Sequence, residues 1–212
     1  MRKYLVLILI ALLACSYAKR PVSTKMPIRK VAFKPMIVLD AGHGGNDQGA
    51  KVNALQEKKI TLMTTLLVKK YLTEMGYHVI LTRSRDVYLT LPKRVDIANK
   101  TEDAVFVSIH YNASRNPEAN GLEVYYCNTA KEEKASKRLA QCVLSQLISQ
   151  THAASRGVKH GNFHVIREAE VPAILVEGGF MTNPEERALL KTKEYLERMA
   201  KGIALGVDKY LG

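Results

Sequence analysis

Residues 36–45 read MIVLDAGHGG, an apolar run that ends in an aspartate and a glycine-rich turn. A short apolar run closed by turn residues is typical of a buried strand. Two later segments follow the same pattern, VFVSIH at 105–110 and AILVEGG at 173–179. The sequence therefore predicts three buried strands, each of which ends beside a histidine or an acidic residue.

Amphipathic segments lie between and after these strands, with apolar residues at the spacing of a helix face. Predicted helices cover 57–75, 91–100, 131–150, 184–190 and 194–211, and further strands cover 78–83, 122–127 and 163–167. Strands that alternate with helices predict an α/β fold, because each helix carries the chain back across the sheet. We expect a central, mostly parallel twisted sheet of about six strands with helices on both faces.

The composition is that of one globular domain. The chain has 212 residues, 47% of them hydrophobic and 25% charged, which excludes a disordered or collagen-like protein. Its net charge of +12 favours anionic surroundings. The absence of tryptophan leaves few stacking platforms for single-stranded nucleic acid, and we expect no nucleic-acid partner. Three cysteines are too few for a disulfide scaffold. Cys127 and Cys142 could pair in an oxidising compartment, but two free thiols are expected.

Residues 1–18 have the pattern of an export signal. Two basic residues precede an apolar run at 4–14, which is too short for a membrane span of about 20 residues but long enough for a signal peptide. Two cleavage patterns compete: small residues allow cleavage before Lys19, whereas LLAC at 12–15 resembles a lipoprotein signal with the lipid on Cys15. Either pattern predicts an exported protein, periplasmic or anchored to the cell envelope.

Residues 19–35 are expected to form a basic tether. They contain six basic residues, three prolines and no acidic residue, a composition typical of an extended, solvated linker. Such a segment could also contact an anionic membrane surface, which would add to the attachment that a single lipid provides. Residues 36–212 would then form the folded domain.

Candidate metal ligands lie where the predicted strands end, which is where sites form in open α/β sheets. His43 follows the first strand, and His110 ends the strand at 104–110. Two histidines at separate strand ends favour a metal site, and a catalytic zinc commonly has three protein ligands and an open position for water. Glu57, at the start of a predicted helix, is the best-placed third ligand. Its spacing alone fits better with an acidic residue that the helix dipole favours in a first turn.

Four motifs together resemble a known protein family. They are IVLDAGHGGNDQGA at 37–50, the pair Glu57-Lys58, VSIHYNAS at 107–114 and VPAILVEGGFMTNPEE at 171–186. In this order they resemble the zinc-dependent N-acetylmuramoyl-L-alanine amidases, bacterial enzymes that cut the amide between muramic acid and the first alanine of the peptidoglycan stem peptide. The resemblance extends over residues 36–212.

The resemblance implies a zinc hydrolase that acts on peptidoglycan in cell-wall remodelling or daughter-cell separation. It places one zinc ion on His43, Glu57 and His110, and it makes Glu177 the catalytic residue. Zinc turns water into a usable nucleophile near neutral pH, and a second carboxyl group can protonate the poor amine leaving group.

Two other functions remain open from the sequence. The zinc centre could serve a peptidase or carboxypeptidase that acts on stem peptides, or the chain could be a non-catalytic wall-binding domain. All four key positions are intact, which disfavours the second alternative. A serine mechanism is also disfavoured, because the S-x-x-K pattern occurs only at 16–19, in the signal region.

No occluding segment is expected between the predicted strand at 122–127 and the next helix. Only residues 128–130 separate these elements, and so short a connection cannot form a helix that covers a site. We therefore expect no obligatory activator.

Several further residues have an open role. Arg83 and Arg94 could bind substrate carboxylates or brace the sheet edge. The ligand histidines need partners that orient their rings, and Asp40 and Asn112 are near them in sequence, but the sequence assigns neither. His164 could line the cleft.

Overall fold

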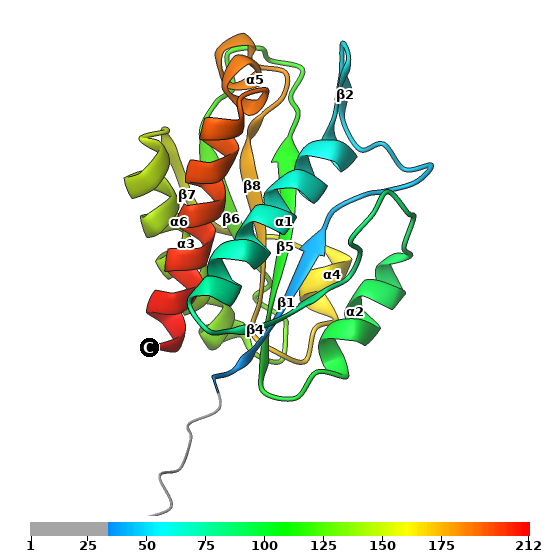
Figure 1. The fold of residues 1–212 in the computed structure, drawn as a ribbon, viewed down its shortest axis with the longest axis vertical. Helices are drawn as coiled ribbons and strands as arrows, with labels where there is room; N and C mark the ends of the chain where they lie inside the picture. The colour runs from blue at the N-terminus through cyan, green and yellow to red at the C-terminus, as the bar shows by residue number, and fades with distance from the viewer. Residues whose placement is uncertain (1–33) are drawn as a thin grey trace, which may run out of the picture. The chain divides into compact units, whose positions relative to one another are not determined.

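The computed structural model describes residues 34–212, so the predicted signal peptide at 1–18, Cys15 and residues 19–33 of the tether lie outside the described residues. The described part contains a six-stranded sheet with the strand order β4-β1-β5-β8-β6-β7 (Figure 1). Its strands are β1 (Met36–Ala41), β4 (His78–Leu81), β5 (Ala104–Asn112), β6 (Leu122–Tyr126), β7 (Ser155–His160) and β8 (Ala173–Phe180). Neighbouring strands are parallel except β6 and β8, which are antiparallel. The predicted α/β class with a mostly parallel sheet is confirmed.

Helices cover both faces of the sheet, as predicted. They are α1 (Glu57–Glu74), α2 (Leu91–Asn99), α3 (Glu133–Thr151), α4 (His164–Arg167), α5 (Pro184–Leu190) and α6 (Lys193–Leu211). On one face α6 packs against both α1 and α3, and on the other α2 packs against α4 (Figure 1). Alternate residues of β1 enter the two cores, with Ile37 and Leu39 in the larger one and Val38 in the smaller one.

Close packing of α3 against α6 depends on two glycines of α6. A Cβ atom at Gly206 would lie 2.4 Å from the Cα of Val143, and one at Gly202 would lie 2.9 Å from the Cα of Leu147. Because both of these nearest atoms belong to helix backbone, no change of side-chain rotamer could relieve the contacts. The two helices therefore approach more closely than any side chain at these positions would allow.

The connection between β1 and α1 contains a short hairpin that the sequence did not predict. It is formed by β2 (Lys51–Val52) and β3 (Leu55–Gln56) and lies outside the main sheet. The hairpin leads directly into α1, and the backbone N–H of Glu57 donates to Ala50 O at 2.9 Å. The first residue of α1 is thereby held beside the chain that leaves β1.

One predicted strand was wrong, and one connection is longer than predicted. Residues 163–167, predicted as a strand, contain α4, and the edge strand is instead β7, whose sequence SRGVKH has no apolar run because the strand lies at the sheet edge and is partly exposed. In addition, β6 ends at Tyr126 and α3 begins at Glu133, so residues 127–132 connect them rather than 128–130.

Two further observations concern the described residues. Cys127 and Cys142 are free thiols, as expected. Within residues 34–212, none of the helices combines the length and the apolar character needed to cross a membrane.

Candidate metal centre

The carboxyl ends of β1, β5 and β8 meet at one edge of the sheet, where the predicted site residues gather. His110 of β5 is in register with Glu177 of β8. The loop after β1 carries His43, and a backbone hydrogen bond of 3.1 Å to Ile109 O holds this loop against β5. The start of α1 adds Glu57. The structure therefore brings together all four residues on which the sequence analysis placed the chemistry.

Three side chains converge on one point. His43 Nε2 lies 3.0 Å from Glu57 Oε1, and His110 Nδ1 lies 3.0 Å from the same oxygen. The three ligand atoms all lie within 4.8 Å of one another. The imidazole rings are steeply inclined to each other, at 78°, with their centroids 4.8 Å apart. Two imidazole nitrogens and one carboxylate oxygen form a donor set typical of catalytic zinc sites.

Glu57 is the most buried of the three side chains and is held by backbone groups. Its Oε2 accepts from Ala50 N at 2.8 Å, and its Oε1 accepts from Tyr111 N at 3.2 Å. Burial raises the pKa of Glu57, but hydrogen bonds from His110 and His43 outweigh burial and hold this pKa well below its usual range. The carboxylate is therefore charged and directed at both histidines.

The loop that carries His43 has an unusual backbone conformation. His43 itself has a φ of 61°, in the left-handed region, and its Nδ1 lies 2.9 Å from Asp47 Oδ2. Burial lowers the pKa of His43, but the carboxylates of Glu57 and Asp47 outweigh burial and raise it. The preceding Gly42 is required for close approach, because a Cβ there would lie 2.2 Å from the ring of His110.

Arg83 and Arg94 hold the backbone of this loop. Arg83 donates from Nε to Ala41 O at 2.9 Å and from Nη2 to Gly42 O at 2.8 Å. Arg94 donates from Nη1 to Ala41 O and from Nη2 to His43 O, both at 2.7 Å. Both side chains are buried, with 3% and 2% of their surface exposed. Of the two roles that the sequence left open, the structure favours bracing.

The residue that orients the ring of His43 is neither of the two that the sequence suggested. Asp40 accepts hydrogen bonds of 2.6–2.8 Å from three buried side chains, those of Thr82, Arg94 and Ser108. Asn112 donates to Glu123 Oε1 at 2.8 Å. Neither residue contacts a ligand ring, and Asp47 orients His43 instead.

Glu177 lies beside the metal centre with a carboxyl group that is not fully hydrogen-bonded. Its Oε2 is buried and has no hydrogen-bond partner among residues 34–212. Burial, together with the negative charges of Glu57 and Glu123, raises the pKa of Glu177 well above its usual range. A buried polar atom without a partner calls for an explanation, and a role in chemistry at the strand end is one such explanation.

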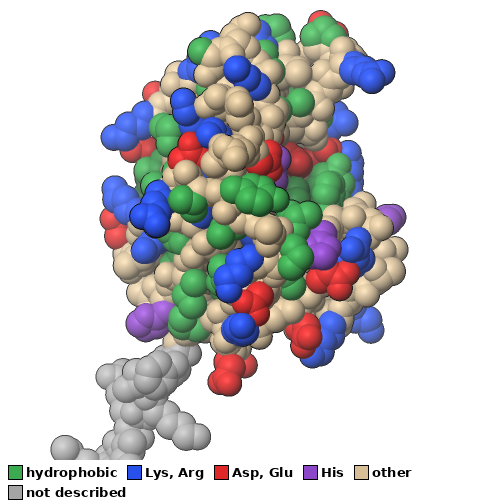
Figure 2. All heavy atoms as spheres, turned by 90° about the vertical axis from the view of Figure 1, so that its right-hand side faces the viewer, with side chains coloured by type: hydrophobic (Ala, Val, Ile, Leu, Met, Phe, Trp, Pro, Cys, Tyr) green, Lys and Arg blue, Asp and Glu red, His purple; other side chains and the backbone are tan. Residues whose placement is uncertain are grey.

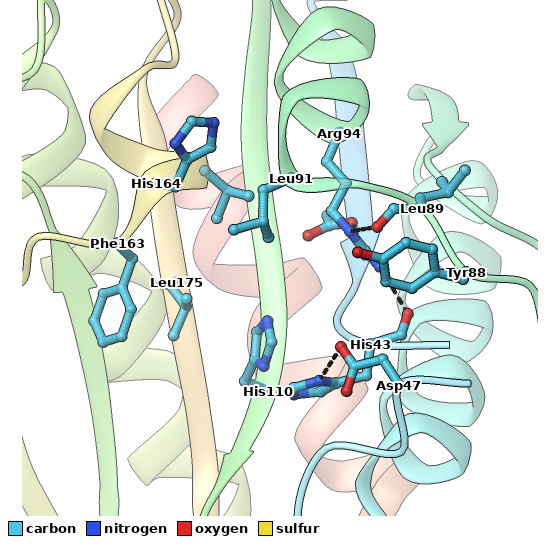
Figure 3. Close-up of a pocket in the computed structure, with 12 residues that line it drawn as sticks. His43, Asp47, Tyr88, Leu89, Leu91, Arg94, His110, Phe163, His164 and Leu175 are labelled. Carbon is cyan, nitrogen blue, oxygen red and sulfur yellow. Dashed lines mark hydrogen bonds and ion pairs between the residues drawn. The ribbon is translucent and has the colours of Figure 1, made fainter. Parts of the chain in front are cut away.

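An open pocket of about 370 Å³ lies over the two histidines. Figure 3 shows Tyr88 and Leu89 on one side of it and Phe163 and His164 on the other, with Leu91 between them and His43 and His110 together at one end. His164, whose role the sequence left open, therefore lines the pocket. On the face that Figure 2 shows, acidic and histidine side chains lie close together with hydrophobic side chains around them.

Comparisons with known proteins agree with this geometry. The family model described as N-acetylmuramoyl-L-alanine amidase matches residues 37–209. The uncharacterized protein YqiI of Bacillus subtilis is 37% identical over 201 residues, which are 95% of this chain and 92% of that protein. The chain spans only 38% and 53% of the lengths of two curated amidases that it also matches.

Two solved structures are similar over most of the described chain. One is the catalytic domain of CwlV, an N-acetylmuramoyl-L-alanine amidase from Bacillus (Paenibacillus) polymyxa, with a TM-score of 0.79, 39% identity, and coverage of 84% of this chain and 98% of that one. The other is the CwlD amidase from Clostridioides difficile in complex with the GerS lipoprotein, with a TM-score of 0.79, 32% identity, and coverage of 84% and 98%.

Proposed function

The chain belongs to the N-acetylmuramoyl-L-alanine amidase family, and from that premise we propose that it hydrolyses the amide between N-acetylmuramic acid and the L-alanine of the peptidoglycan stem peptide. One observation carries the proposal: His43, Glu57 and His110 direct their ligand atoms at one point beside Glu177. The reaction serves cell-wall remodelling or daughter-cell separation.

The residues at this point fit one zinc ion. His43 and His110 offer imidazole nitrogens, and Glu57 offers a carboxylate that is already charged and fixed by backbone N–H groups. Zinc bound by these three residues supplies a Lewis acid that polarises the substrate carbonyl and lowers the pKa of water toward about 7. Asp47 keeps the ring of His43 in the orientation that directs Nε2 at the centre.

Glu177 moves the protons in this proposal. It accepts a proton from the attacking water and donates it to the amide nitrogen as the C–N bond breaks. The water oxygen ends in the new carboxylate on the muramic acid side, and the alanine nitrogen leaves as an amine. Its buried Oε2 and its raised pKa support this role, because a carboxyl group that gives up its proton less readily than usual is suited to returning one to the leaving amine.

The substrate lies outside the cytoplasm, so the proposal requires export. The predicted signal at 1–18 provides it, followed by the basic tether at 19–35 and the catalytic domain at 36–212. Cleavage before Lys19 would release the enzyme into the periplasm, whereas a lipid on Cys15 would anchor it to the envelope.

The test is digestion of purified muropeptides, followed by mass analysis of the bond that is cut. We expect cleavage on the muramic acid side of L-alanine, and we expect a metal chelator to abolish it and added zinc to restore it. Cleavage within the stem peptide would show a peptidase instead. Undiminished cleavage by the His110→Ala variant would contradict the assigned metal ligands.

A further inference from the structure

A second polar cluster lies next to Glu177, on the side away from the metal centre. Glu177 of β8 is in register with His110 of β5 on one side and with Glu123 of β6 on the other. Residues in register on neighbouring strands point to the same face of a sheet, and neighbouring strands lie about 4.8 Å apart. His110, Glu177 and Glu123 therefore form a row across the sheet.

Glu123 is buried, and its carboxylate is fully hydrogen-bonded. Its Oε1 accepts from Asn112 Nδ2 and from the Tyr125 hydroxyl, both at 2.8 Å. Its Oε2 accepts from Arg156 Nε at 2.9 Å and from Lys159 Nζ. Burial raises the pKa of Glu123, but these contacts outweigh burial and lower it, so the carboxylate is charged. Two cations therefore share one carboxylate oxygen, and one positive charge is left over.

Arg156 and Lys159 each have N–H donors that bind no acceptor among the described residues. The side chains of Arg156 and Lys159 are each 37% exposed. Arg156 also donates from Nη1 to Asn120 O, but in the part of the chain that the structure describes its Nη2 has no hydrogen-bond acceptor. The ring of Phe180, 4.9 Å from the guanidinium carbon, keeps this group in place. Lys159 Nζ binds only Glu123 among the described residues, which leaves two of its three N–H groups free.

The basic pair, Arg156 and Lys159, lies on the path that the peptide part of the substrate would follow from the metal centre. The scissile carbonyl must lie at the metal centre, and the scissile nitrogen must lie beside Glu177. A peptide that continues in the same direction from that nitrogen passes Glu123 toward β7. Because an extended chain advances about 3.3–3.6 Å per residue, a group one or two residues beyond the scissile amide reaches the basic pair.

We propose that Arg156 and Lys159 form a subsite for a carboxylate on the peptide side of the substrate, one or two residues beyond the scissile amide. This inference rests on the proposed function. The two cations are fixed by Glu123, so they need little rearrangement to bind an anion, and they offer N–H groups to both oxygens of a carboxylate. The subsite selects substrates by the charge of the released peptide, through binding that is the same before and during the reaction.

The experiment compares two substrates for the zinc-loaded full chain, a muropeptide with that carboxylate free and the same muropeptide with it amidated. For Lys159→Met we expect KM for the free-carboxylate substrate to rise about tenfold, with little change in kcat. The amidated substrate should be cut by the variant and the wild type at similar rates. Lys159→Arg should keep the preference, because it keeps the charge. Arg156→Met should have the same effect as Lys159→Met. Each single variant keeps one cation beside Glu123, so the buried carboxylate stays paired.

The control is Lys131→Met, which removes the same charge from an exposed pair with Glu170 and tests for general attraction to an anionic substrate. An equal rise in KM for both substrates, or no change for either, would overturn the subsite while leaving the amidase activity intact. A wild-type chain that cuts neither substrate would instead overturn the proposed function and the inference with it.

Discussion

A single substitution can distinguish the proposed role of Glu177, which is proton transfer, from that of the three candidate metal ligands. Glu177→Gln keeps the size of the side chain but cannot carry the proton, so we expect activity to fall by about 10²–10⁴ while zinc content stays near that of the wild type. Turnover on muropeptides and metal analysis of the same preparation measure the two effects. His110→Ala is the matched control and should lose both. Loss of zinc from Glu177→Gln would make Glu177 a ligand and would contradict its proposed role.

Single residues also show where sequence reasoning succeeded and where it failed. The strand ends could be predicted from apolar runs, which placed His43, His110 and Glu177 at one edge of the sheet. Glu57 was the best-placed third ligand, but only the family resemblance decided in its favour, because a first-turn acid has an ordinary explanation of its own. Asp47 was missed, because its contact depends on the left-handed φ of His43 in an irregular loop. The glycines around His43 were the available signal that this loop turns tightly.

The packing of helix α3 against helix α6 can be tested directly. Gly206→Ala places a methyl group 2.4 Å from the backbone of Val143, so α3 and α6 must separate. We expect this overpacking to lower the free energy of unfolding by about 1–3 kcal/mol, measured by denaturant titration. Ser145→Ala, at an exposed position on α3, is the control and should change this free energy little. An unchanged midpoint for Gly206→Ala would show that the two helices do not pack as described.

The elements that the sequence predicted incorrectly are the short ones. Residues 163–167 contain adjacent apolar residues, Val165 and Ile166, that are both buried in α4, and so short a run fits a strand as well as one helical turn. β7 was not predicted because it is an edge strand with Arg156 and Lys159 in place of an apolar run. The long helices were predicted to within a few residues, because several turns of periodic apolar positions leave little ambiguity.

At the scale of the whole domain, residues 34–212 leave the candidate metal centre accessible. Tyr88 and Leu91, which line the pocket, are 56% and 51% exposed. The connection at 127–132 is longer than predicted, yet a helix of that length would span only about 9 Å. Its first residue, Cys127, is also buried in the smaller core, which holds the start of the connection in place. We therefore infer that this connection does not cover the site.

Activity without an activator is the prediction that follows from this open site. The similar CwlD amidase was solved in complex with the GerS lipoprotein, so dependence on a partner is a real alternative for a catalytic domain of this fold. We expect the purified, zinc-loaded mature chain to digest peptidoglycan alone, because its pocket and ligands are already arranged without a partner. The measurement is the initial rate with and without an envelope extract of the source cells, and the control is Glu177→Gln, which should stay inactive in both. A wild-type chain that holds a full complement of zinc but digests nothing until the extract is added would show that a partner, rather than the length of the connection at 127–132, controls access to the site.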